Sequence, residues 1–279
     1  MTSEPKIAKV QAICNETDMT LTRFFVLATS LPFLATLSPA FAEEVGSRQY
    51  ELDLGVGLMA QPRYPGSDET IFVPYPLIAV SKFFVPGYGS IDGDKDTRGL
   101  TVYPSFNFIG KRESSDSNEL EGLDDVDWSL EAGLGVSYRY DWIRGFVEVR
   151  QGFNGYSGQV AQFGVDLIGN PTEDLEVRFG PRAGWGSQSY MQTYFGISSQ
   201  EAVDSPLYDK SYKADAGFNT AGLAGSASYK LTESWKLHAL AGWERMIGDA
   251  GNSPIVEEGS ENQFYGGAGL TYRFAFDIF

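Results

Sequence analysis

The chain has 279 residues, of which 42% are hydrophobic, 14% aromatic and 21% charged, and its formal net charge at pH 7 is −16. The mean hydropathy is −0.21 and no apolar run reaches the length of a membrane-spanning helix, about 18 residues, which excludes a helical membrane protein. The acidic balance argues against a nucleic-acid partner, which requires a basic surface, and the 19 Phe, 15 Tyr and 5 Trp argue against disorder.

The first 42 residues are predicted to be a presequence that contains a secretory signal peptide. A mostly apolar stretch covers residues 24–37, and the Ala-Phe-Ala sequence at 40–42 has the form of a cleavage site. The first 18 residues do not resemble the short basic start of a signal, which leaves Met19 as an alternative start of translation. We therefore expect one folded domain over residues 43–279.

Apolar and polar side chains alternate along most of the remaining chain. From Trp128 to Tyr140 the period is two for thirteen residues, which indicates a β-strand because an amphipathic helix has a period of 3.6. The same alternation recurs at intervals to residue 274. Eleven candidate strands follow, at 49–59, 71–80, 82–91, 98–109, 127–140, 142–151, 159–169, 175–187, 213–230, 235–247 and 262–274.

These strands have the length and the two faces of membrane-spanning strands. A tilted crossing needs about 9–11 residues, whereas strands of soluble sandwiches usually have about five or six. The apolar faces end in aromatic residues, and the opposite faces carry charges interleaved with glycine, which suits a polar lumen better than a packed core. We predict an all-β fold, a closed antiparallel transmembrane β-barrel, with a secreted β-sandwich as the alternative.

An even number of strands is expected for a single-chain bacterial barrel, so eleven candidates leave one assignment wrong. Ten strands result if 71–91 is one bent strand, and twelve if the stretch Tyr190 to Ile197 contains another; we favour twelve. The short connectors at 140–142, 170–174 and 231–234 are predicted to be periplasmic turns. The longer polar segments 110–126, 188–212 and 248–261 are predicted to be surface loops, with the side of 110–126 left open.

Four segments carry a resemblance to a known family. They are Tyr64-Pro65-Gly66-Ser67-Asp68, the acidic stretch 123–127 that leads into Leu130-Glu131-Ala132-Gly133-Leu134, the aromatic stretch 190–196, and 248–256. In this order they resemble the MipA/OmpV family of outer-membrane proteins, over roughly residues 49–274. The chain departs from the family at its end, because it continues for five residues beyond Phe274.

The resemblance implies a barrel in the outer membrane of a Gram-negative bacterium, in contact with lipid and lipopolysaccharide. The family's named role is non-enzymatic scaffolding, in which the barrel joins a lytic transglycosylase to a bifunctional penicillin-binding protein during peptidoglycan remodelling. Related members are linked to adhesion or to porin-like roles. The terminal pattern Gly269, Tyr272 and Phe274, or the final Phe279, resembles the signal read by the barrel-assembly machinery.

Charged side chains on the predicted lumen face are the candidate functional residues. They would tune the selectivity of a diffusion channel if the lumen is open, or form a closed salt-bridge network if it is plugged. Arginines and carboxylates paired at one height predict a plug; we favour a scaffold over a channel. The candidates are Arg139, Arg144, Arg150, Arg178, Arg182, Glu51, Asp53, Glu131, Glu148, Asp166 and Glu176.

Catalytic and metal sites find little support in the sequence. His238 is the only histidine and is expected on the lumen face beside an acid, away from the rim where lipid chemistry would occur. One histidine leaves only carboxylates as metal ligands, and Asp92-Gly93-Asp94-Lys95-Asp96 matches only part of a calcium loop. The acidic cluster over 119–127 is a candidate surface for cations or a basic partner, and more simply a solubilising loop. We predict no cofactor, no metal site and no enzymatic activity.

Overall fold

The computed structural model describes residues 49–85, 89–92 and 98–277, and the side chains of all of these except 79–92. All of them belong to the compact unit Val45–Phe279. The predicted signal peptide, the two alternative starts, residues 93–96 of the calcium-like segment and Phe279 lie outside the described residues. The predicted start of the folded domain at residue 43 also lies outside them and stays a prediction.

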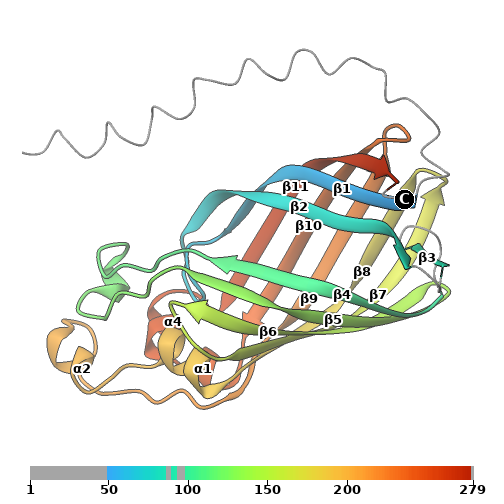
Figure 1. Cartoon of the computed structure of the whole chain (residues 1–279). Helices are drawn as coiled ribbons and strands as arrows, with labels where there is room; N and C mark the ends of the chain where they lie inside the picture. Colours follow the sequence, from blue (N-terminus) through green and yellow to red (C-terminus); the bar gives the residue numbers. More distant parts are fainter. Residues whose placement is uncertain (1–48, 86–88, 93–97, 278–279) are drawn as a thin grey trace, which may run out of the picture. The chain divides into compact units, whose positions relative to one another are not determined.

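Eleven β-strands of the described chain form one antiparallel sheet that curls on itself (Figure 1). Ten of them have 11 to 16 residues, as expected for strands that cross a membrane, and β3 has only four. Their bounds are β1 Tyr50–Pro62, β2 Thr70–Val85, β3 Gly89–Asp92, β4 Gly99–Ile109, β5 Ser129–Tyr140, β6 Ile143–Asn154, β7 Gln159–Thr172, β8 Leu175–Gly186, β9 Gly217–Lys230, β10 Trp235–Met246 and β11 Asn262–Phe276.

The strands are ordered β3-β2-β1-β11-β10-β9-β8-β7-β6-β5-β4, so the first and last long strands pair with each other. Leu54 stands opposite Tyr272 in that ladder. Within the described ladders the sheet has two edges, β3 with β2 on one side and β4 on the other. The all-β antiparallel class is therefore confirmed, whereas the predicted closure into a barrel stays a prediction.

The preferred count of twelve strands is not found in the described chain. The stretch from Tyr190 to Ile197, which we considered as a twelfth strand, instead contains helix α1 (Gln188–Phe195), whose buried side chains lie at helical spacing. The stretch 71–91 is largely one long strand, β2, followed by the short β3. The ten long strands match the ten-strand alternative.

The two faces of the sheet are chemically opposite. Apolar side chains face outward, where Val56 is 73% and Leu134 61% exposed, while Glu131 and Asp166 are each 2% exposed on the inner face. Burial of charge beneath an exposed apolar surface is the reverse of a soluble sandwich and suits a lipid-facing wall. Exposed aromatic residues lie toward both ends of the strands, for example Tyr138, Tyr140 and Trp142 at one end and Phe108, Trp128 and Phe264 at the other.

Glycines on the inner face make room for tyrosine rings of the neighbouring strand. Tyr103 on β4 stands opposite Gly135 on β5, and a Cβ on Gly135 would lie 2.4 Å from the tyrosine ring. Gly57 with Tyr75 and Gly242 with Tyr265 repeat the arrangement. The lumen glycines therefore have a packing role, as alternation of small and large interior residues predicts.

Both edges of the sheet contain proline. Pro74 and Pro76 lie in β2, and Pro104 lies in β4. Proline has no N–H to donate to a ladder, and in sheets it is confined mainly to edge strands, strand starts and bulges. The three prolines therefore lie where the strand order places the two edges of the sheet.

The five connections that follow β1, β4, β6, β8 and β10 lie at one end of the antiparallel sheet, opposite the C-terminal end of β11 (Figure 1). Together they form a cap, which we define as residues 63–69, 110–128, 155–158, 187–216 and 247–261. The cap contains η1 (Asn118–Leu120), α1, α2 (Glu201–Asp204), α3 (Gly248–Gly251) and α4 (Pro254–Glu258). No helix in the described part of the chain has the length and hydropathy needed to span a membrane.

The segments 110–126, 188–212 and 248–261, which were predicted as surface loops, all lie in the cap, and the side of the membrane that they face stays a prediction. They are packed together and contain short helices, which the sequence analysis did not predict. Residues from separate segments, among them Tyr64, Leu120, Ile197 and Ile255, pack into a shared hydrophobic cluster. A second cluster is centred on α1, where Phe195 is 0% exposed. The segment 110–126, whose side was left open, lies at the same end as the others.

Candidate functional site

The polar interior of the curled sheet is the candidate functional site, and ion pairs occupy much of it. Arg150 on β6 lies 3.0 Å from Glu131 on β5 and 2.7 Å from Glu148, measured between nitrogen and carboxylate oxygen. Tyr103 and Ser105 on β4 donate hydrogen bonds to Glu148 at 2.9 and 2.8 Å. One arginine thus joins two carboxylates that are anchored by three strands.

A second cluster reverses this charge balance. Asp166 on β7 accepts from Arg144 at 3.1 Å and from Arg182 at 2.5 Å, so one carboxylate joins two arginines. Both guanidinium groups also lie over the ring of Phe146, 4.9 and 5.0 Å from its centroid. Such cation–π contacts are an additional attraction at a partly desolvated site.

Two further clusters lie nearer the end of the sheet where β1 begins and β11 ends. Arg139 on β5 lies 3.5 Å from Glu176 on β8, although two strands separate β5 from β8 in the sheet. Arg178 lies 2.6 Å from the same Glu176. This contact across the interior shows that the sheet curls with its charged face inward.

The last cluster links β1, β10 and β11. Arg273 on β11 lies 3.2 Å from Glu51 and 2.7 Å from Asp53, both on β1, and Lys236 lies 3.6 Å from Asp53. The structure therefore places all eleven candidate lumen charges on the inner face in ion pairs. The sequence analysis omitted Arg273 and Lys236 from the candidates, although both lie on polar faces of alternating strands.

The cap is attached to this network by tyrosines. Tyr156 in the β6–β7 connection donates to Glu131 at 2.7 Å. Its ring contacts Tyr190 and Tyr194 of α1 edge-on, with centroids 5.2 and 5.7 Å apart. Burial raises the pKa of Tyr190 above the ordinary tyrosine value, so its hydroxyl stays neutral. An aromatic cluster therefore closes the interior over the Arg150 network.

Arg112 holds the cap segments together and was missed by the sequence analysis. Its side chain is 3% exposed, and its guanidinium donates to the backbone carbonyl of Tyr194 at 3.1 Å and that of Asp124 at 3.5 Å. Burial lowers the pKa of Arg112, while the nearby carboxylate of Glu201 opposes that effect. The sequence gives no periodic signal for this residue because its partners lie in other segments.

Most of the net negative charge of the chain is located in the cap. Its connecting segments contain 17 acidic and five basic side chains. The acidic cluster predicted at 119–127 belongs to this surface, but Glu119 accepts a hydrogen bond from Tyr64 and thus has a structural role. The described residues contain no group of three or more His, Cys, Asp or Glu arranged to hold a metal.

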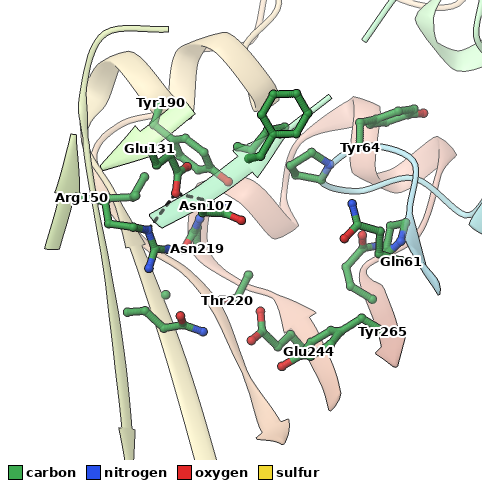
Figure 2. A pocket seen from close by; sticks show the side chains of 18 of the residues that line it. Gln61, Tyr64, Asn107, Glu131, Arg150, Tyr190, Asn219, Thr220, Glu244 and Tyr265 are labelled. Atoms are coloured by element: carbon green, nitrogen blue, oxygen red, sulfur yellow. Dashed lines mark hydrogen bonds and ion pairs between the residues drawn. The ribbon is translucent and has the colours of Figure 1, made fainter. Parts of the chain in front are cut away.

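A cavity of about 630 Å³ lies inside the sheet next to the cap (Figure 2). Tyr190 and Tyr64 of the cap line it at one end, and Arg150, Glu244 and Tyr265 line it from the strands. We call this space the lumen cavity. Glu244 was not among the predicted site residues, although it shares the polar face of β10 with His238.

His238 and the predicted assembly residues occupy ordinary structural positions. The ring nitrogens of His238 lie 3.1 and 2.9 Å from the hydroxyls of Ser228 and Thr271. Tyr272 and Phe274 lie near the C-terminal end of β11, where Tyr272 contacts both Phe274 and Trp235. Gly269 lies opposite Gly57 in the β1–β11 ladder. An assembly role for Gly269, Tyr272 and Phe274 stays a prediction.

An outward apolar wall, aromatic bands near both ends and an ion-paired polar interior define the class of outer-membrane β-barrel proteins. A family model described as MltA-interacting protein MipA matches residues 54–274. The chain belongs to this family, as the sequence resemblance predicted.

The chain is similar to several named proteins. It is 24% identical over 264 residues to the MltA-interacting protein of Escherichia coli (strain K12), covering 91% of this chain and 100% of that protein. A second relative, outer membrane protein Omp26La of Vibrio anguillarum, is 34% identical over 96 residues, 34% of this chain and 35% of the relative. These matches confirm the predicted outer-membrane location.

Two solved structures that resemble the chain come from outer-membrane proteins. A bacterial polysaccharide outer membrane secretin is 11% identical and covers 80% of this chain and 98% of its own, with a TM-score of 0.36. Neisserial surface protein A is 10% identical and covers 82% of this chain and 97% of its own, with a TM-score of 0.25.

Proposed function

We propose that this protein closes into a ten-stranded outer-membrane barrel and acts as a non-enzymatic scaffold for cell-wall enzymes, not as a permanently open channel. The observation that carries this proposal is the pairing of lumen charges: each of the eleven candidate residues has an ionic partner within the wall. Free rings of charge, which select ions in a channel, would require unpaired side chains facing the same passage.

We also propose an orientation, which the lengths of the connections support. Outer-membrane barrels have short turns on the periplasmic side and long segments outside the cell. The cap is thus the external end, and the turns after β5, β7 and β9, with the C-terminal end of β11, face the periplasm. A periplasmic partner then meets a small surface that includes the exposed carboxylates of Asp141, Asp174 and Glu233.

The name of the Escherichia coli relative supports a lytic transglycosylase of the MltA type as this partner. A penicillin-binding protein is the second partner that the family resemblance implies. Because Asp141, Asp174 and Glu233 are exposed on this periplasmic surface, we expect the partner surface to be basic. Binding is then expected to weaken in 1 M salt, where the Debye length falls to about 3 Å.

A pull-down of an MltA-type lytic transglycosylase by the refolded mature protein tests the scaffold. The double variant Asp141→Arg/Asp174→Arg is expected to lose binding, whereas Asp209→Arg, an exposed acid of the cap, retains it. Equal binding by all three proteins, or binding that is unchanged in 1 M salt, contradicts the proposed surface.

Single-channel recording in a planar bilayer tests the alternative, a diffusion channel. Heat-modifiable migration on a gel first establishes that the protein has folded. A folded and electrically silent protein supports the scaffold, and steady discrete conductance steps overturn it in favour of a channel. An adhesin role would place the binding surface on the acidic cap, and loss of cell attachment in Asp209→Arg would support it.

A further inference from the structure

The lumen cavity contains a carboxylate for which the described part of the protein supplies no ionic partner. Glu244 on β10 is half-buried and lines the cavity, and no described basic side chain forms an ion pair with it. The hydroxyls of Thr220 and Tyr265 lie beside its carboxylate. Figure 2 shows Glu244 and Tyr265 on the wall of the cavity, across an open space from Arg150 and Glu131.

The basic groups around the cavity are already engaged. Arg150 donates to both Glu131 and Glu148, so this group of three carries an excess negative charge of its own. Arg182, whose charge acts on Glu244, is paired with Asp166 at 2.5 Å. Arg144 shares Asp166 with Arg182, so three arginines, at 144, 150 and 182, face four carboxylates, at 131, 148, 166 and 244. Among these described side chains one net negative charge remains, which a bound cation would neutralise.

A second acceptor on the cavity wall lacks a donor. Asn219 is 6% exposed, lines the cavity, and has a side-chain oxygen, Oδ1, without a hydrogen-bond partner in the structure. Buried amide oxygens are nearly always hydrogen-bonded, because an unpaired one costs about 1–3 kcal/mol. The free acceptor of Asn219 and the carboxylate of Glu244 would both be satisfied by a ligand with N–H donors and a positive charge.

Size and lining favour an organic cation over a metal ion. The volume, about 630 Å³, falls within the range of small-molecule sites, and no metal-binding group of three ligands is present among the described residues. The rings of Tyr64, Tyr190 and Tyr265 line the space, and aromatic faces attract ammonium groups.

We propose that the lumen cavity binds a small organic ammonium compound whose cationic nitrogen pairs with Glu244, with Asn219 as a further hydrogen-bond acceptor on the cavity wall. The cavity also extends to the edge of β4, the edge that would be paired in the proposed closed barrel. Phe106, which is 69% exposed on the outward face of β4, and Asn107, whose amide donates to Glu131 in the interior, both line it. The cavity therefore reaches around the edge of β4, beside the β1–β2 connection.

Isothermal titration calorimetry of the refolded mature protein in detergent micelles tests this site with three matched probes. Benzylammonium carries the proposed cation, benzyl alcohol is neutral, and phenylacetate is an anion of similar size. We expect saturable binding of benzylammonium. Benzyl alcohol and phenylacetate are expected to bind at least about tenfold more weakly, because a charge-assisted hydrogen bond is lost. Absence of saturable benzylammonium binding at millimolar concentration overturns the proposal, as does equal binding of benzyl alcohol.

Two carboxylate variants separate the site from a general effect of charge. Glu244→Gln keeps the shape of the side chain and is expected to weaken benzylammonium binding about tenfold or more. Glu176→Gln, which removes a lumen carboxylate that does not line the cavity, is expected to leave binding unchanged. Equal losses in the two variants contradict the assignment to Glu244.

A folding defect is not expected to account for a loss of binding in Glu244→Gln. Glu244 has no ionic partner among the described residues, so its replacement by a neutral amide removes a desolvation cost and is expected to keep the protein folded. Asn219→Leu supplies an independent variant, with an expected loss of several-fold because one neutral acceptor is removed. The proposal is independent of the scaffold role, since binding is measured without a protein partner.

Discussion

The wall of strands and the cap obey opposite rules within one chain. In the wall, Glu131 is 2% and Val56 73% exposed, whereas in the cap Phe195 is fully buried and acidic side chains cover the surface. The wall places its apolar atoms against lipid and its charges inside, and the cap is organised like a small water-soluble domain. The medium around each region, and not the composition of the chain, determines which residues become the interior.

The largest expected effect comes from breaking an ion-paired cluster in the wall. Arg150→Leu leaves Glu131 and Glu148, whose side chains are 2% and 19% exposed, without their shared cation. Because a buried charge without a partner is costly, we expect the free energy of unfolding to fall by about 3–5 kcal/mol. Urea-induced unfolding of the refolded protein in micelles measures this change.

Arg98→Leu is the matched control for that substitution. Arg98 pairs with Asp141 at the short-turn end, where the two side chains are 66% and 56% exposed. An exposed pair contributes about 0–1 kcal/mol, so this variant is expected to unfold almost as the native protein does. Similar losses in Arg98→Leu and Arg150→Leu would show that the interior charges are as well hydrated as those of the surface.

A cavity in the cap is the next largest perturbation. Phe195→Ala removes a ring that is 0% exposed and packs against Tyr190, at an expected cost of about 3 kcal/mol. Hydrogen exchange is expected to rise in α1 and the other cap segments while the wall stays protected. Val203→Ala, at a position that is 77% exposed, serves as the control. Uniform loss of protection in cap and wall would show that the two regions unfold as one.

A smaller effect is expected where a glycine accommodates a tyrosine ring. A Cβ in Gly135→Ala would lie 2.4 Å from Tyr103, which also donates to Glu148, so the ring has to move. We expect a loss of about 1–3 kcal/mol from overpacking. Gly145→Ala, where nothing lies within 4 Å of the added methyl group, is expected to be neutral in the same urea experiment. A neutral Gly135→Ala would indicate that Tyr103 has free space beside it.

The smallest effect concerns pH at the junction of cap and wall. The backbone N–H of Trp128, with Asn154 and Lys111, lowers the pKa of Asp127. A lowered folded-state pKa contributes stability above the unfolded value, about 3.9, and this contribution is lost as the pH falls through the folded-state value. The free energy of unfolding should therefore fall slightly less between about pH 6 and about pH 3 in Asp127→Asn than in the native protein. An unchanged difference would contradict this role.

The wall could be predicted from the sequence because the alternation of apolar and polar residues within each strand shows which face meets lipid and which faces inward. Alternation at 128–140 identified β5, and the polar face of that strand identified Glu131 and Arg139 as lumen residues. The cap could not be predicted in this way. Ile197 and Ile255 are buried by segments distant in the chain, and this contact has no local period.

The same reason explains the missed site residues. Glu244 lies on a polar face that the alternation identifies, but the absence of an ionic partner depends on which side chains the curled sheet brings opposite to it. Arg112 lies in a segment without periodicity and is buried by carbonyl groups of other segments. Pairing and cavities are properties of the assembled sheet, whereas periodicity is a property of one strand.

The prolines of β2 and β4 have a mechanical consequence. Pro74, Pro76 and Pro104 contribute no backbone donor, so a ladder formed between these two edge strands has fewer hydrogen bonds available than one between β5 and β6. A cylinder under strain separates along the line with the fewest bonds. In the closed barrel that we propose, that line would run along the edge of β4 that the lumen cavity reaches, so the part of the wall that is easiest to separate would also be the part nearest to a guest molecule in the cavity.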